Sequence, residues 1–120
     1  MGQTYEGADN RKYLRVFKNY SLLFSFRDLP DQKSDGTFIK DISKGGVRFT
    51  TSKPIKVGTI LILEISIPYI APKKLFLEGL VISSKEVTPH LVYEIRAQFD
   101  KLDGPTLEIF DMVEKRNKGL

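Results

Sequence analysis

Two short groups of residues in this chain have types and spacings suited to binding a small anion. Arg11 and Arg15 stand four positions apart, a spacing that projects both side chains to the same side in an extended or a helical segment. Further along the chain, Asp41, Ser43 and Gly46 form an Asp-x-Ser-x-x-Gly pattern. Arginine offers a rigid fork of donors, aspartate accepts hydrogen bonds and serine can donate them.

Each group also has a purely structural explanation. The side chains of Asp41 and Ser43 can bond to nearby backbone N–H groups and shape a turn. Gly46 can supply a backbone conformation that other residues disfavour. Arg11 and Arg15 can simply be solvated charges, so the residue types alone leave both explanations open.

The distribution of charge adds to the case for an anionic ligand. The chain has 19 Lys and Arg against 15 Asp and Glu, a net charge of +4. Residues 1–53 contain ten basic and six acidic residues, whereas residues 54–120 contain nine of each. This local surplus fits a small anion or a limited phosphate contact better than a nucleic-acid polymer, which usually requires a longer basic stripe. A solvated basic face without a ligand is the alternative.

The usual signatures of enzymes are missing from the sequence. There is no cysteine, and the single histidine, His90, follows Thr88-Pro89 in an expected turn, where we predict a solvent-exposed side chain. The carboxylates show no acid–base pairing, and we expect Glu64, Glu78 and Glu94 to point outward from strands. No phosphate-binding glycine loop, dinucleotide fingerprint or calcium loop is present. We therefore predict no catalytic residue, no metal site and no cofactor.

Composition and hydropathy predict one ordinary globular domain. Of the 120 residues, 41% are hydrophobic and 28% are charged. The longest apolar stretch is interrupted by Glu64, Ser66 and Pro68 and is too short for a membrane helix, so no membrane insertion is expected. The first residues do not resemble a signal peptide. These features predict a soluble, cytoplasmic protein.

Alternating apolar and polar residues predict a chain of short strands. Polar and turn-forming residues between Leu29 and Gly36 indicate a long loop, and Ser43-Lys-Gly has the length of a hairpin connection. Gly79 suggests a bend or a bulge within its strand. The expected strands cover Tyr20 to Arg27, Thr37 to Ile42, Gly46 to Thr51, Leu61 to Ile67, Lys74 to Val87 and Leu91 to Phe99.

The C-terminal segment has a helical pattern instead. Gly104-Pro105 provides a start with proline at the first helical position, and Gly119 provides a stop. Several short strands joined by tight turns would leave exposed edges in a flat sheet. We therefore predict a mainly β fold, a closed or nearly closed barrel of five or six strands with the helix over one opening. Residues 1–10 are expected to form a flexible tail.

With both motifs in this order, the sequence resembles the PilZ domain family, receptors for the bacterial second messenger cyclic di-GMP. The family is marked by Arg-x-x-x-Arg followed by Asp/Asn-x-Ser-x-x-Gly. The resemblance runs from about Arg11 to Val113 and includes the segments Asp-Ile-Ser-Lys-Gly-Gly-Val-Arg-Phe and Tyr-Glu-Ile-Arg-Ala-Gln-Phe. It implies a six-stranded antiparallel β-barrel with a C-terminal α-helix over residues 11–117.

The resemblance also implies a ligand and a role for each motif residue. Arg11 and Arg15 would grip guanine edges and phosphate oxygens, or stack on the bases. Asp41 would accept hydrogen bonds from guanine N–H groups, Ser43 would donate to phosphate or base, and Gly46 would keep the backbone tight against the ligand. Asn10 stands where some members carry a further arginine, which leaves the stoichiometry open. Ala97 stands where we would expect a glycine.

In this interpretation the ligand orders the Arg-x-x-x-Arg segment over the barrel, and a downstream protein partner reads the new surface in motility, biofilm or virulence control. A PilZ-like interaction module that binds no nucleotide is the first alternative. A single-stranded nucleic-acid binder is the second, and it would require aromatic residues exposed on a basic strand face. We expect most aromatic residues of the strands to pack in the core instead. They are Phe17, Tyr20, Phe24, Phe26, Phe38, Phe49 and Phe76.

Overall fold

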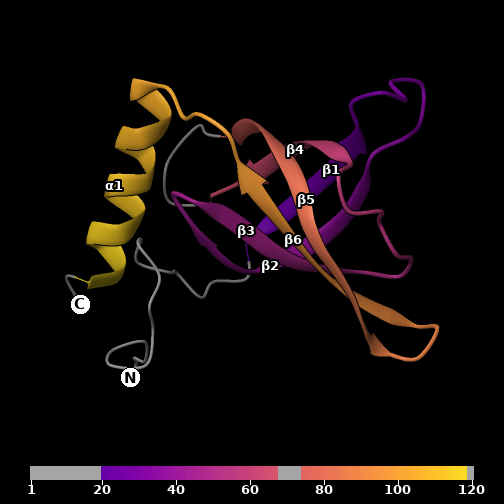
Figure 1. The fold of residues 1–120 in the computed structure, drawn as a ribbon. Helices are drawn as coiled ribbons and strands as arrows, with labels where there is room; N and C mark the ends of the chain where they lie inside the picture. The colour runs from indigo at the N-terminus through magenta and orange to yellow at the C-terminus, as the bar shows by residue number, and fades with distance from the viewer. Residues whose placement is uncertain (1–19, 68–73, 119–120) are drawn as a thin grey trace.

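Strands dominate the computed structural model, which describes residues 20–67 and 74–118. This part of the chain forms six strands followed by one helix (Figure 1). They are β1 (Ser21–Phe26), β2 (Asp35–Ser43), β3 (Gly46–Thr51), β4 (Ile60–Ser66), β5 (Lys74–Thr88), β6 (Val92–Phe99) and α1 (Gly104–Lys118). Every predicted strand and the predicted helix are therefore present, although β2 begins at Asp35, inside the segment expected to be a loop. The expected tail, residues 1–10, lies outside the described residues.

The six strands close into an antiparallel barrel. Their order around it is β1-β2-β3-β6-β5-β4, and β4 pairs back onto β1. The pairing of Ser21 with both Phe38 of β2 and Ser66 of β4 closes the ring. The fold class predicted from the alternating pattern is confirmed. A closed barrel removes the free edges that a flat sheet of these strands would expose.

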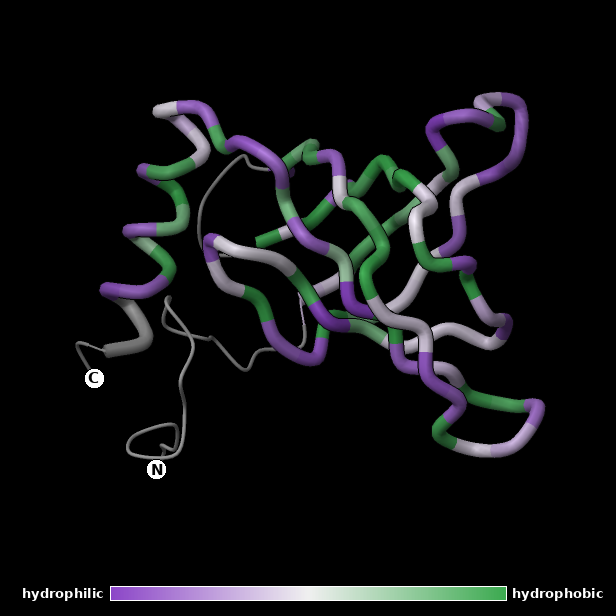
Figure 2. The backbone as a smooth tube through the Cα atoms, viewed as in Figure 1, coloured by the Kyte–Doolittle hydropathy of each residue, from purple (hydrophilic) through white to green (hydrophobic). Residues whose placement is uncertain are grey.

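Alternate residues of each strand fill the interior of the barrel. In β4, Leu61, Leu63 and Ile65 point inward and are fully buried, whereas the residues between them are partly exposed. Hydrophobic and hydrophilic stretches alternate along the strands, and the loop between β1 and β2 is largely hydrophilic (Figure 2). Phe24 and Phe49 meet inside the barrel, with ring centroids 5.5 Å apart. The core is thus contributed by facing strands, as the period-two pattern predicts.

Two phenylalanines predicted to be in the core lie on the outside. Phe38 is 62% exposed and Phe76 is 66% exposed, because Ile39 and Leu75, their neighbours in the chain, take the inward positions. Tyr20, Phe24 and Phe49 are buried as predicted. Phe26 packs against the core while partly exposed, and Phe17 lies outside the described residues. Where adjacent residues are all apolar, the pattern does not determine which of them faces inward.

Gly79 does not form the bend or bulge suggested by its position in β5. Its pairing with Leu61 and Phe99 is regular, and the irregularities of β5 fall between Val81 and Ser83 and between Glu86 and Thr88. A Cβ atom at Gly79 would lie 2.9 Å from Leu63 Cδ1 and 3.1 Å from the Ala97 Cβ. The glycine therefore makes room for these two side chains in the barrel interior.

Helix α1 covers one end of the barrel, as predicted (Figure 1). It begins at Gly104, so Pro105 is its second residue rather than its first. Asp103 caps it by accepting a 2.8 Å hydrogen bond from Thr106 N–H, and hydrogen bonds from the side chain and backbone of Thr106 lower the pKa of Asp103. Phe110 is buried and its ring centroid lies 5.9 Å from that of Phe99, so the helix seals this end of the core.

His90 lies in the short connection between β5 and β6. Its φ is 62°, and its side chain is 92% exposed. A residue in the left-handed region is common in such three-residue hairpin loops. The prediction of a solvent-exposed loop histidine is confirmed.

The seal between α1 and the barrel can be tested with two variants of the helix. Phe110→Ala should lower the free energy of unfolding by about 3–5 kcal/mol, because it leaves a cavity against Phe99. Met112→Ala, at a position that is 48% exposed, should change it little. Urea unfolding of both proteins measures the difference. Equal losses in the two variants would show that Phe110 does not anchor the helix.

Candidate functional site

The Asp-x-Ser-x-x-Gly residues lie together on the hairpin of β2 and β3. Ser43 pairs with Gly46, so only Lys44 and Gly45 form the turn, one residue fewer than the connection predicted from the sequence. The hydroxyl of Ser43 accepts a 3.2 Å hydrogen bond from Gly45 N–H. This is the local turn bond expected from the structural explanation of Ser43, and its role toward a ligand stays a prediction.

A β-bulge in β2 turns Asp41 to the outer face of the barrel. Ile39 pairs with Phe49 inside the barrel, but the next pair is Asp41 with Arg48, so β2 contains one extra residue, Lys40. Without the bulge, Asp41 would share the inward face of Ile39 because side chains alternate along a strand. The bulge therefore takes a carboxylate out of the apolar interior and sets it opposite an arginine.

Asp41 and Arg48 form the central ion pair of the site. Arg48 Nη2 lies 2.5 Å from Asp41 Oδ2, and Arg48 Nη1 lies 3.5 Å from Glu94 Oε2 on β6. The Asp41 side chain is fully buried, and that of Arg48 is 23% exposed. A buried carboxylate costs several kcal/mol unless it is paired. Arg48 therefore holds one oxygen of Asp41 in place while linking the hairpin to β6.

Position 46 requires a glycine because a side chain there would clash with a neighbouring strand, not because its backbone conformation is unusual. Gly58 is the glycine with a left-handed φ in the described part of the chain, and Gly46 does not adopt one. A Cβ atom at Gly46 would lie 2.4 Å from the carbonyl oxygen of Ala97 on β6. The glycine thus lets β3 approach β6 at the start of the hairpin.

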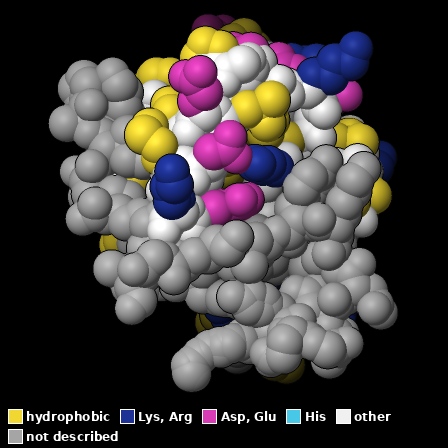
Figure 3. Space-filling view, turned by 90° about the vertical axis from the view of Figure 1, so that its left-hand side faces the viewer, with side chains coloured by type: hydrophobic (Ala, Val, Ile, Leu, Met, Phe, Trp, Pro, Cys, Tyr) yellow, Lys and Arg dark blue, Asp and Glu magenta, His cyan; other side chains and the backbone are white. Residues whose placement is uncertain are grey.

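The tip of the hairpin is fastened to helix α1 and to β6. Lys44 Nζ lies 2.5 Å from Asp111 Oδ1 and 3.9 Å from Glu114 Oε1, both on α1. The carbonyl oxygen of Gly45 accepts a 3.0 Å hydrogen bond from Phe99 N–H. Acidic and basic side chains alternate on the described part of the side that faces the viewer in Figure 3. The motif hairpin and the helix are therefore mechanically linked.

The structure brings together three of the five predicted site residues. Asp41, Ser43 and Gly46 share one hairpin, whereas Arg11 and Arg15 lie outside the described residues, and their roles stay predictions. Within residues 20–67 and 74–118, no group of three His, Cys, Asp or Glu side chains could hold a metal ion. No helix in the same ranges has the length and hydropathy needed to cross a membrane.

Arg48 and Glu94 are structural partners of the site that the sequence analysis did not identify. In the sequence Arg48 stands only as part of the segment that resembles the PilZ family, and Glu94 was expected only as an outward-pointing charge. A two-residue turn at Lys44-Gly45 would have predicted the pairing of Asp41 with Arg48. Such a turn pairs Ser43 with Gly46, and counting back along both strands then sets Asp41 opposite Arg48. The longer turn inferred from the sequence left this register undetermined.

The crowding at Gly46 leads to a prediction about stability. Gly46→Ala should destabilise the fold by roughly 1–3 kcal/mol, because the new methyl group must displace the backbone of β6. Gly104→Ala is the matched control, since a Cβ there meets no atom within 4 Å. Thermal unfolding followed by circular dichroism compares the two. An unchanged melting temperature for Gly46→Ala would refute the steric role.

The ion pair of Arg48 leads to a second prediction. Arg48→Met should cost roughly 3 kcal/mol of stability, because it removes a partner of a buried carboxylate. Arg27→Met is the control, because Arg27 forms a solvent-exposed pair with Glu78 at 3.4 Å, of a kind that contributes at most about 1 kcal/mol. Urea unfolding near neutral pH gives both values. Similar small losses in both variants would contradict the structural role of Arg48.

Comparisons with solved structures identify other proteins with the same fold. The chain is similar to the Bacillus subtilis inhibitor of motility MotI/DgrA, with 14% identity and a TM-score of 0.73, over 91% of this chain and 51% of that one. It is also similar to the PilZ domain of YcgR from Escherichia coli, solved with c-di-GMP, with 15% identity and a TM-score of 0.66, over 92% and 95% of the two chains.

A third similar structure is the Klebsiella MrkH–c-di-GMP complex, with 16% identity and a TM-score of 0.63, over 92% of this chain and 56% of that one. The chain thus spans about half the length of MotI/DgrA and of MrkH. No curated protein matches it significantly in sequence. At these identities the structural likeness establishes the fold.

The family itself follows from the sequence match. The model of the PilZ domain matches residues 9–113, which include both motifs and all six strands. The barrel, the motif hairpin and the closing helix are the parts that the sequence resemblance implied. The chain belongs to the PilZ domain family.

Proposed function

We propose that this chain is a cyclic di-GMP receptor that binds the dinucleotide at the β2–β3 hairpin and passes the signal to a protein partner. The observation that carries the proposal is the single hairpin that brings Asp41, Ser43 and Gly46 together, in a family member that also contains Arg11 and Arg15. The c-di-GMP complexes of YcgR and MrkH support it, because their barrels resemble this one.

The chemistry of guanine fits the residue types of the two motifs. Its N–H groups are donors that a carboxylate such as Asp41 can accept, and its O6 and N7 form a paired acceptor for an arginine fork. The phosphodiester groups require cations, which Arg11 and Arg15 can provide. In the proposed complex Asp41 reads the base, and the two arginines close over the ligand from the N-terminal segment.

In the proposed function, ligand binding changes the protein surface that a partner recognises, and no reaction is catalysed. A ligand that bridges the N-terminal segment and the hairpin favours the closed arrangement by its differential affinity for that state. Because Lys44 ties the hairpin to Asp111 of α1, movement of the hairpin would also reach the helix. A partner protein in the bacterial cytoplasm, acting in motility or surface control, would read this change without catalysis by the receptor.

A PilZ-like interaction module that binds no nucleotide is the second candidate. One observation favours it: the structural bonds of Asp41 to Arg48 and of Ser43 to Gly45 already account for these two motif residues. In that case the motif would serve the hairpin alone. Binding of the dinucleotide separates the two candidates.

Titration calorimetry with cyclic di-GMP tests the proposal. The unmodified protein should bind saturably, and Arg15→Ala and Asp41→Asn should each weaken binding roughly 10- to 100-fold, the value of one charge-assisted hydrogen bond. Arg27→Ala removes an exposed arginine outside the site and should bind normally.

The linear dinucleotide and GTP serve as ligand controls in the same titration and should bind more weakly. Absence of heat for the unmodified protein at high ligand concentration would reject the receptor proposal and favour the interaction module.

A further inference from the structure

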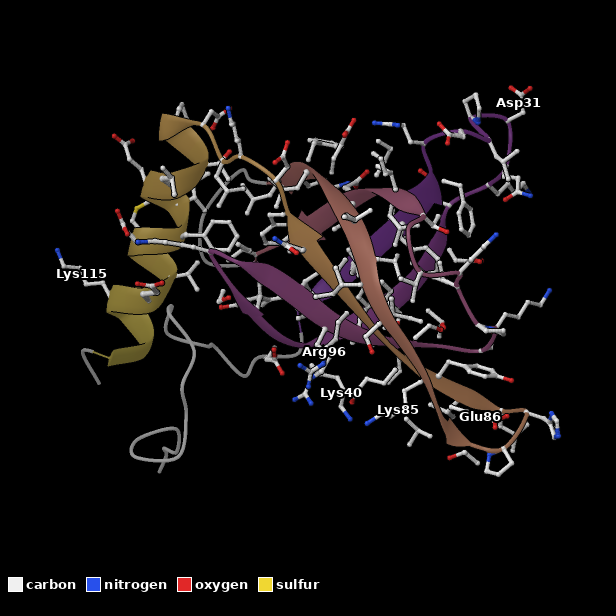
Figure 4. The ribbon with its side chains drawn as sticks, viewed as in Figure 1. Asp31, Lys40, Lys85, Glu86, Arg96 and Lys115 are labelled. Carbon is white, nitrogen blue, oxygen red and sulfur yellow. The ribbon has the colours of Figure 1, made fainter. Side chains whose placement is uncertain are left out.

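Three cations outside both motifs gather on the outer face of the sheet beside Asp41. They are Lys40 of β2, Lys85 of β5 and Arg96 of β6, which we call the basic face. In Figure 4 these labelled side chains point to the same side of the barrel. Lys40 follows inward-facing Ile39 and therefore points outward, and the bulge brings Asp41 to the same outer face beside it.

The sheet register places the three cations within reach of one small ligand. Arg96 pairs across the strands with Arg48, which pairs with Asp41, and Lys85 pairs with Glu94 in the next outward row. From β2 to β5 is three strand spacings, about 14 Å. The basic face therefore adjoins Asp41 and has the width of a dinucleotide.

The charges of this surface are unbalanced. Lys40 and Lys85 are exposed, Arg96 is half-buried, and none of the three forms an ion pair with another described residue. The neighbouring carboxylates of Asp41 and Glu94 are both engaged by Arg48. Arg96 moreover lies directly opposite Arg48, and like charges at paired positions are unfavourable. An anion on this face would relieve the repulsion.

We propose that the basic face is an additional phosphate-binding subsite of the dinucleotide site, so that the ligand extends from Asp41 across β3 toward β6 and β5. This inference rests on the proposed function. Asp41 and Glu94 share the one guanidinium of Arg48, so the four cations and two carboxylates of this region leave a surplus of two positive charges. A phosphodiester would supply negative charge to balance part of this surplus. Exposed Phe38 lies two residues before Lys40, but a single ring on a face this narrow suits a small ligand better than a polymer.

The test compares two triple variants with the same change of charge. Lys40→Gln, Lys85→Gln and Arg96→Gln are combined in the basic-face variant. Lys33→Gln, Lys56→Gln and Lys101→Gln, all at exposed positions, are combined in the control variant. Cyclic di-GMP is titrated into both and into the unmodified protein at low and high salt, and circular dichroism checks that each variant is folded.

The basic-face variant should bind cyclic di-GMP at least roughly tenfold more weakly than the control variant, with a smaller dependence on salt. Equal affinities of the two variants, with the unmodified protein binding normally, would overturn the subsite and leave the receptor function standing. No binding by the unmodified protein would overturn both. Tighter, salt-sensitive binding of a thymidine oligonucleotide that the basic-face variant loses would assign the face to a polymer and overturn the proposal.

Discussion

The register of β2 against β3 is the constraint on which the rest of the site depends. A two-residue turn and one bulge residue, Lys40, together place Asp41 on the outer face opposite Arg48. A regular strand would bury this carboxylate in the barrel, among residues that cannot pair with it. On its other side β3 pairs with β6, and there Gly46 lies against the carbonyl of Ala97 and lets the two strands approach. Fold and candidate site therefore share one set of backbone pairings.

The hairpin is also where the barrel meets its helix. Lys44 at the turn contacts Asp111 and Glu114, and Phe110 on the same helix seals the core against Phe99. A ligand at the hairpin would therefore act on a contact shared with the C-terminal helix rather than on an isolated loop. Such a contact is a physical route by which binding can alter a distant surface, provided that the ligand favours one arrangement over the other.

Much of the fold could be predicted from the sequence, because the period of two along each strand and the helical spacing near the C-terminus are strong local signals. The failures have a common cause. Phe38 and Phe76 each stand next to another apolar residue, so the alternation does not show which of the two neighbours faces the core. The bulge at Lys40 and the pairing of Asp41 with Arg48 depend on contacts between strands. Motif spacing identified Asp41, Ser43 and Gly46, but Arg48, the partly exposed partner of Asp41, could be found only from the strand register.

The central claim is that cyclic di-GMP binds at the β2–β3 hairpin, and backbone amide spectra recorded by NMR during a titration test it most directly. With ¹⁵N-labelled protein, we expect the largest changes of chemical shift in the amides of residues 41–48 and of Arg96, and small changes in β1 and β4, which contain no residue of the proposed site. Unchanged spectra at saturating ligand, or changes confined to β1 and β4, would contradict the account.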